Sequence, residues 1–256
     1  MVFRKTIPLL LFKTSANLRA EVSRYYLNYL WWIIDPVLTM ATFYVVFGIF
    51  LNRGIPHFVA FLLIGLTAWN WFARSVQHSA NSILQGRGLM MQVDIPKIFF
   101  PLEIFLRDTF KHLFVVVLLL VFLVFYPTPV SETWVALPVL MIAQAALILS
   151  ISIICAMVVP FVQDLSFVIG TGIQLMFFGS GIFYRIEDVV LPEHQHILYL
   201  NPMAGLLKEY RNVLMYSTWP DWVYIGKIFL VSCLLLVFAV YMLRKLDYIY
   251  PRISQQ

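Results

Sequence analysis

Six long apolar stretches restrict what this chain can fold into more than any other feature. They cover approximately residues 30–51, 58–72, 113–126 (extending back toward 102), 134–159, 165–183 and 222–243. A helix needs about 20 apolar residues to cross the hydrocarbon core of a bilayer. Strands of a membrane barrel instead alternate over about ten residues, which these stretches do not do. The sequence therefore predicts an all-α integral membrane protein with six transmembrane helices.

The scarcity of charge supports the same class. Only 12% of the 256 residues are charged, whereas a soluble domain carries about 25%. We therefore expect a single membrane domain over residues 1–256, without a second soluble domain. Cys155 and Cys233 both lie within apolar stretches, so we expect buried thiols and no disulfide.

The basic residues predict the orientation. If the N-terminus is cytoplasmic, thirteen of the 18 Lys and Arg residues lie inside, and five lie outside: Arg53, Arg185, Lys208, Arg211 and Lys227. Cytoplasmic loops collect Lys and Arg, so both termini are expected in the cytoplasm. The net charge of +5 is then a sign of topology, and no nucleic-acid partner is expected.

Two segments outside the spans have amphipathic patterns. Residues 14–29 place apolar side chains at helical spacing, which predicts an interfacial helix on the cytoplasmic leaflet. Residues 185–221 lie on the outer side, where Asn201 can cap a helix that has Pro202 at its first position. The apolar face of that helix must dock on the bundle or re-enter the bilayer, so we expect short outer re-entrant helices here.

The third segment is the longest polar break, residues 74–111 between spans two and three. It is basic, amphipathic and interrupted by prolines. Within it we predict a short helix over residues 82–94 that contacts a soluble partner. A solvated loop with a basic stripe facing the membrane is the alternative.

Motifs for chemistry within this chain are missing from the sequence. It has no phosphate-binding P-loop, no zinc-ligand spacing and no nucleophile elbow. Asp35 and Asp164 are among the few ionisable residues near the spans, which disfavours a proton-coupled carrier. We therefore expect no cofactor and no catalytic or metal site in this chain.

Four stretches together resemble one family. They are YLNYLWWIIDP at 26–36, FLLIGLTAWNWF at 61–72, MMQVDIPKIFFPL at 90–102 and YLNPMAGLLKEYRNVLM at 199–215. In this order they are similar to the permease subunits of type-2 ABC exporters of O-antigen, capsular polysaccharide and teichoic acid. The chain departs from the family where Leu27 and Asn28 replace Leu-Gly, and where Gln163 replaces an Arg before span five. Gly181 also stands where a proline is common.

The resemblance implies a homodimer in the bacterial inner membrane with two copies of a separate ABC ATPase. That ATPase would bind ATP and Mg²⁺, so this chain would be a non-catalytic pore subunit in contact with membrane lipids. The predicted helix at 82–94 would be the coupling helix. The residues expected to couple to the ATPase are Ile83, Leu84, Arg87, Met90, Met91, Val93 and Asp94.

The substrate implied by the resemblance is a polysaccharide on a lipid carrier, with O-antigen preferred. Sugars stack on aromatic rings, which combine an apolar body with a polar edge. The residues predicted to line the channel are Tyr25, Tyr26, Trp31, Tyr44, Trp69, Gln174, Phe177, Phe178 and Tyr184. Span five, which is rich in glycine, is expected at the dimer centre. Arg24, Arg87 and Lys97 are candidates to steer the carrier's pyrophosphate, although topology explains them equally well.

The outer motif supplies the last candidate residues, Asn201, Pro202 and Arg211. The alternative function is a type-2 ABC permease for capsule, teichoic acid, a drug or a lipid. A secondary carrier would need more ionisable residues inside the spans. A membrane enzyme acting on lipid-linked sugars would need clustered carboxylates or histidines at one membrane face.

Overall fold

The computed structural model describes residues 2–23, 30–50, 57–127 and 130–250, and these ranges contain helices and no strand. The first half holds α1 (Val2–Ser23), α2 (Trp31–Phe43), the π-helical η2 (Tyr44–Phe50), α3 (Phe58–Ala80), α4 (Ser82–Gln85), α5 (Arg87–Met90) and α6 (Phe99–Phe125). The second half holds the 3₁₀ turn η3 (Glu132–Ala136), α7 (Leu137–Val158), α8 (Leu165–Gly179), α9 (Ile186–Val189), α10 (Pro192–Leu198), α11 (Pro202–Leu214) and α12 (Trp222–Leu246). The all-α prediction is confirmed for these residues.

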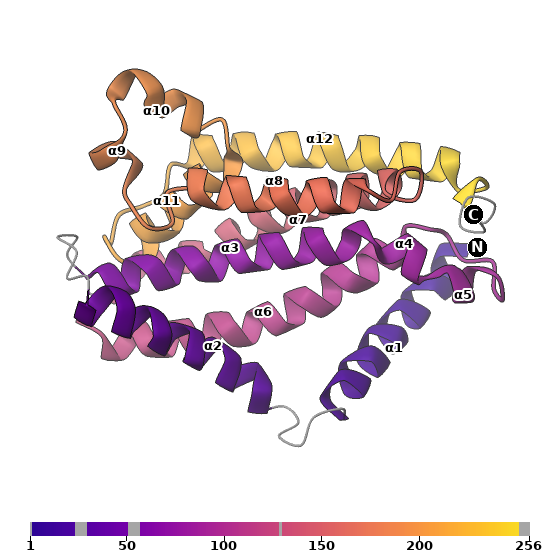
Figure 1. Ribbon diagram of the computed structural model, residues 1–256, viewed down its shortest axis with the longest axis horizontal. Helices are drawn as coiled ribbons and strands as arrows, with labels where there is room; N and C mark the ends of the chain where they lie inside the picture. The colour runs from indigo at the N-terminus through magenta and orange to yellow at the C-terminus, as the bar shows by residue number, and fades with distance from the viewer. Residues whose placement is uncertain (1, 24–29, 51–56, 128–129, 251–256) are drawn as a thin grey trace.

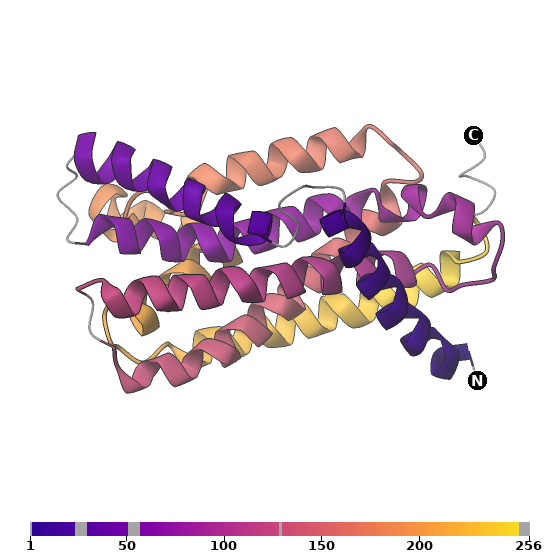
Figure 2. The same cartoon turned by 90° about the horizontal axis from the view of Figure 1, so that it is seen from below.

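The long helices form one bundle with two distinct ends (Figure 1). Helices α3, α6, α7, α8 and α12 run along its length, while α4 and α5 lie at one end and α9, α10 and α11 at the other. We call these the inner end and the outer end, after the predicted orientation. Figure 2 shows α2 crossing over α3 and α1 diverging from the bundle axis.

Four helical segments among the described residues are long and apolar enough to cross a membrane. They are Phe58–Ala80, Phe99–Phe125, Glu132–Val158 and Trp222–Leu246, which coincide with the second, third, fourth and sixth predicted spans. Two of these helices extend beyond the predicted apolar stretches at the inner end of the bundle. Helix α3 continues from residue 72 to Ala80, and α6 already begins at Phe99. The backbone remains helical through these polar turns, which a prediction from hydropathy does not include in the spans.

The first and fifth predicted spans correspond to shorter apolar helices. Their apolar parts are Pro36–Val46 and Leu165–Gly179. At 1.5 Å per residue, the 15 residues of α8 extend roughly 22 Å, less than the ~30 Å hydrocarbon core. The count of six spans therefore stays a prediction.

Helix α3 occupies the middle of the bundle. It packs against α6, α7, α8 and α11, and most of its residues are buried, including Phe61, Ile64 and Phe72. Its buried side chains form the main hydrophobic core together with those of α6, α7 and α11. Elements that contact α3 are therefore held in place by the most buried of the four membrane-length helices among the described residues.

The N-terminal helix starts earlier than predicted. Helix α1 begins at Val2 and continues through Pro8 to Ser23, whereas residues 24–29 lie outside the described part. It docks on α6 through two polar contacts. The Asn17 Nδ2 donates to Glu103 Oε1 over 3.0 Å, and Lys111 Nζ lies 2.6 Å from Glu21 Oε2. These contacts place α1 beside the inner half of α6.

Candidate functional site

The predicted coupling helix over 82–94 is two single turns instead of one helix. Helix α4 ends at Gln85, Gly86 separates the turns, and α5 ends at Met90. The Val93 N–H donates to the Leu89 carbonyl over 3.0 Å, which continues the turn without a further helix. This segment projects at the inner end of the bundle (Figure 1).

One side of this segment is part of a second hydrophobic core. Ile83 is 0% exposed and Met90 is 8% exposed, and Ile95 lies beside them. They pack with Phe99, Phe100 and the inner ends of α7 and α12. Ile83 and Met90 therefore anchor the segment to the bundle, and their side chains do not face a soluble partner in this structure.

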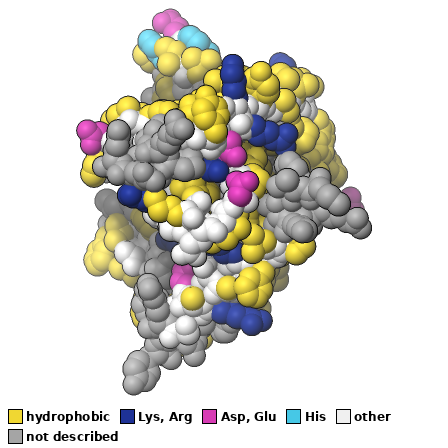
Figure 3. Space-filling model, turned by 90° about the vertical axis from the view of Figure 1, so that its right-hand side faces the viewer, with side chains coloured by type: hydrophobic (Ala, Val, Ile, Leu, Met, Phe, Trp, Pro, Cys, Tyr) yellow, Lys and Arg dark blue, Asp and Glu magenta, His cyan; other side chains and the backbone are white. Residues whose placement is uncertain are grey.

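The other side of the segment faces outward. Arg87 and Asp94 are exposed, and Met91 and Val93 are 53% and 50% exposed. We call these four residues the inner contact edge. Figure 3 looks onto this end of the molecule, where Lys and Arg side chains lie among hydrophobic ones. A surface that mixes exposed apolar and charged side chains is suited to a protein partner.

Lys97, a candidate for steering pyrophosphate, is buried at this end. It is 5% exposed, its backbone N–H donates to Asp247 Oδ1 over 2.9 Å, and its Nζ lies 3.7 Å from Asp247 Oδ2. Close to this contact, the hydroxyl of Tyr250, which follows α12, donates to the Met157 carbonyl of α7 over 3.0 Å. Lys97 therefore ties the segment to the end of α12, and its position does not suit a phosphate ligand. Arg24 lies outside the described residues.

Gly86 is required by close packing at this segment. A Cβ at Gly86 would lie 2.1 Å from Cε1 of Phe100, whereas a Cβ at Gly88 meets no atom within 4 Å. We expect Gly86→Ala to lower the free energy of unfolding by about 1–3 kcal/mol through overpacking. Gly88→Ala should leave stability unchanged or raise it slightly, because alanine is the better helix former. Thermal unfolding of both variants in detergent measures the difference, and equal stability would contradict this packing.

The residues predicted to line the channel occupy different environments. Tyr25 and Tyr26 lie outside the described residues. Trp31 and Tyr44, on α2 and η2, are 40% and 48% exposed. Trp69 is 3% exposed and packs against Phe72 and Phe177 with ring centroids 5.4 and 5.7 Å away. Trp69 is therefore a core residue of the protomer and not an open lining residue in this structure.

Helix α8 presents the other predicted channel residues. It has no buried residue; Gln174 is exposed and Phe178 is 58% exposed, whereas Phe177 turns toward Trp69. Tyr184 is half-buried and donates to the Phe178 carbonyl over 2.8 Å. Among the described elements, α8 packs chiefly on α3. Its remaining surface is largely apolar, with Thr171 and Gln174 as exposed polar residues, and it is available to another chain or a substrate.

At the outer end, Asn201 and Pro202 start α11 as the sequence predicts. The Asn201 Oδ1 accepts from the Met203 N–H over 3.0 Å, and Pro202 takes the first helical position. Asn201 also donates through Nδ2 to Ser180 Oγ, 2.7 Å away. The helix cap thus also holds the end of α8.

Arg211 of α11 also binds the residues that follow α8, next to the Ser180 contact of Asn201. It is 6% exposed, and it donates to the carbonyls of Phe61, Gly181 and Ile182 over 3.2, 2.9 and 3.1 Å. Its guanidinium lies 3.4 Å from the centroid of the Phe61 ring. Burial lowers the pKa of Arg211 to about 9, so it remains charged at neutral pH.

We call Asn201, Arg211 and their acceptors on residues 61 and 180–182 the outer latch. It joins α11, the start of α3 and the end of α8. Gly181 has φ of +68°, a conformation that glycine adopts readily. The sequence showed the two motifs at 180–184 and 199–215 separately, but it carried no signal that they contact each other.

A polar cluster lies next to the outer latch. Glu187 Oε1 lies 2.7 Å from Lys208 Nζ and accepts from the Tyr199 hydroxyl over 2.6 Å. Burial alone would raise the pKa of Glu187, but the hydrogen bonds from Lys208 and Tyr199 outweigh it and lower the pKa to about 2. The cluster therefore holds α9 against α11 at neutral pH.

This cluster should weaken in acid. A carboxylate with a lowered folded-state pKa contributes stability above its unfolded value, about 4.5, and loses it as the pH falls toward about 2. Because Glu187 and Lys208 are more than a third exposed, we expect an effect below about 1 kcal/mol. Hydrogen exchange of residues 186–200 at pH 7 and pH 3, corrected for intrinsic rates, should show this opening. Glu187→Gln should remove the pH dependence, and an unchanged dependence would contradict the assignment.

Comparisons with known proteins agree with this architecture. Residues 13–215 match the family described as ABC-2 type transporter. Two proteins of Klebsiella pneumoniae named O-antigen export system permease protein RfbA are 28% and 26% identical over 246 residues, which cover 96% of this chain and 94% of each of them. The protein of that name from Myxococcus xanthus is 26% identical over 83% of this chain and 82% of its own length. Because the family match covers most of the chain, from the middle of α1 to the end of α11, this chain belongs to the ABC-2 type transporter family.

Proposed function

We propose that this chain is the permease subunit of an ABC transporter that exports a lipid-linked polysaccharide, O-antigen, across the inner membrane. The observation that carries the proposal is the similarity to O-antigen export permeases over 96% of the chain. The apolar helical bundle is consistent with a transport pore subunit rather than a soluble component.

In this proposal two copies of the chain pair and two separate ATPase subunits attach at the inner end. The ATPases bind ATP and Mg²⁺ and deliver work through contact. The inner contact edge supports this, because Met91 and Val93 are half-exposed while Ile83 and Met90 bind the same segment to the bundle. A force applied at the edge would reach α3 and α6, which directly flank the segment.

The membrane arrangement in this proposal has six spans with both termini in the cytoplasm. Helices α2 and α8 would be the first and fifth spans, completed by the dimer and the lipid around them. The α9–α11 region would form the outer re-entrant part. The unpaired surface of α8, with Gln174 and Phe178, would lie at the dimer centre and face the glycan.

Disruption of the gene tests the proposal. Cells without this chain should lose O-antigen from their surface and accumulate the lipid-linked polymer inside, and complementation should restore export. Loss of a capsule or teichoic acid, with O-antigen intact, would assign the chain to another substrate of the same family. No change in any surface glycan would overturn the glycan assignment, and purification without an ATPase partner would overturn the subunit assignment.

A further inference from the structure

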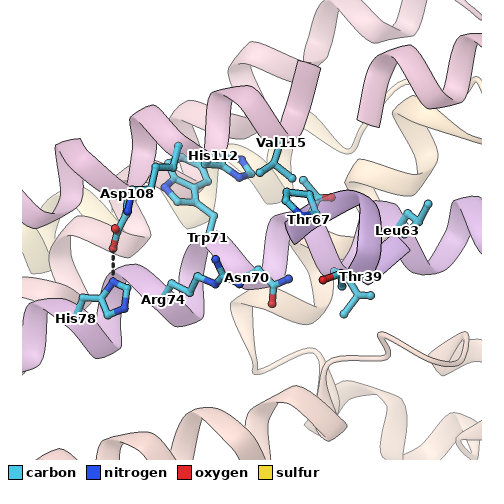
Figure 4. Close-up of a pocket in the computed structure, with 13 residues that line it drawn as sticks. Thr39, Leu63, Thr67, Asn70, Trp71, Arg74, His78, Asp108, His112 and Val115 are labelled. Atoms are coloured by element: carbon cyan, nitrogen blue, oxygen red, sulfur yellow. Dashed lines mark hydrogen bonds and ion pairs between the residues drawn. The ribbon is translucent and has the colours of Figure 1, made fainter. Parts of the chain in front are cut away.

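A groove with a polar inner end lies between α2, α3 and α6 (Figure 4). It contains about 750 Å³ of space outside the protein atoms, including its open side. Its inner end is polar, with Asn70, Arg74, His78, Asp108 and Lys111 among the lining residues.

Charges of both signs meet at the polar end of the groove. His78 Nδ1 lies 2.8 Å from Asp108 Oδ2, and Lys111 is held 2.6 Å from the Glu21 carboxylate of α1. Arg74 extends its guanidinium between His78 and Asn70 (Figure 4). Among the side chains that the structure describes, the cations Arg74 and Lys111 and the carboxylate of Asp108 line the inner end, and Glu21 adjoins it through Lys111.

The wall of the groove is rigid at this level. The rings of Trp71 and His112 stack with centroids 4.4 Å apart and nearly parallel planes, and both side chains are buried. The Trp71 Nε1 donates to Thr109 Oγ1 over 3.2 Å, which fixes the indole. The polar end is thus a preformed site and does not depend on a mobile loop.

Toward the outer end the groove becomes apolar. A second cavity shares Leu63 with the first and is lined by side chains including Val37, Ala41, Val59 and Phe122. Along α3, the rise over the 15 residue steps from Val59 to Arg74 is roughly 22 Å. A ligand that fills both cavities must join a polar group at one end to a long hydrocarbon chain.

We propose that this groove binds one zwitterionic phospholipid of the surrounding membrane. Its phosphate contacts Arg74 and Lys111, its ammonium group lies near Asp108, and one acyl chain follows the apolar cavity along α2 and α3. A pyrophosphate lipid carrier fits less well, because its several negative charges would enter a site lined by the Asp108 carboxylate, where Lys111 is already paired with Glu21. Uncompensated charge within a membrane is costly. The lipid fills the space beside α2.

Lipid retention by the full-length chain purified in mild detergent tests this. Mass spectrometry of the bound lipid should find about one phosphatidylethanolamine per protomer, in preference to added phosphatidylglycerol and polyprenyl monophosphate. Arg74→Gln should weaken its retention about tenfold, since a hydrogen-bonded charge contact to the phosphate is lost. Asp108→Asn should remove the preference for phosphatidylethanolamine over phosphatidylglycerol. Lys245→Gln changes an exposed cation at the inner end but outside the groove and should leave retention unchanged.

A second variant tests the proposal without changing any charged residue of the groove. Ala41 is exposed and lines the apolar cavity, so Ala41→Trp should occupy that space and displace the lipid while all groove charges remain. Retention unaffected by both Arg74→Gln and Ala41→Trp would overturn the proposal. Tighter binding of polyprenyl monophosphate than of phosphatidylethanolamine would also overturn it, because the groove would then hold an anionic carrier.

Discussion

Replacing Arg211 with methionine should lower the free energy of unfolding by about 3–5 kcal/mol, because the buried carbonyls of three residues lose their donor at once. The side chain is 6% exposed, so water cannot readily replace the guanidinium. The end of α8 would then lose its attachment to α11 and to α3. We expect a lower unfolding temperature in detergent, and export lost with it.

Two variants control for this prediction. Lys208→Met removes a cation one turn earlier on the same helix, where the side chain is 45% exposed, and should cost less than about 1 kcal/mol. Arg211→Lys should not restore stability, because one ammonium group cannot reproduce the fork of a guanidinium. Similar unfolding temperatures for Arg211→Met and Lys208→Met would refute the structural role of Arg211.

The second large effect is expected at the inner contact edge. Met91→Asp and Val93→Asp should each reduce ATPase co-purification and export about tenfold or more, since a carboxylate would be buried against the partner. Both side chains are about half-exposed, so the permease itself should still fold. Pull-down of the ATPase and the export assay measure the two consequences separately.

Leu200→Asp is the matched control for the inner variants. Leu200 is 79% exposed but precedes α11 at the outer end, so the same change there should leave ATPase binding intact. Ile83→Asp and Met90→Asp would be uninformative, because these side chains belong to the inner core and their loss would unfold the segment. Normal ATPase binding by Met91→Asp and Val93→Asp would remove the edge from the coupling contact.

The hydropathy of the sequence predicts where the long helices lie, but it does not predict the residues at which they end. The predicted segment at 58–72 lies within α3, but the helix continues to Ala80 because its polar last turns pack on neighbouring helices. The helix at 82–94 was predicted from an apolar stripe. The structure has two single turns with Gly86 between them, and the ring of Phe100 occupies the space that a side chain at this position would need.

For the candidate site residues, too, the sequence does not predict which side chains are buried. Met90 and Met91 are adjacent and chemically identical, yet one is 8% and the other 53% exposed. The sequence offers Lys97 as a candidate to steer pyrophosphate, but in the structure it is buried and pairs with Asp247, 150 positions later. The sequence predicts Trp69 as a channel aromatic, but its packing against Phe72 and Phe177 places it in the core.

By itself, the sequence determined the membrane class, the positions of the apolar helices and the motifs that mark the ABC-2 family, because these depend on local composition and order. Only the tertiary structure decided that Arg211 joins three elements, that Val93 faces outward and Ile83 inward, and that a polar groove lies between α2, α3 and α6. Burial and pairing depend on neighbours that are distant along the chain. A single sequence does not specify which of many apolar faces meet.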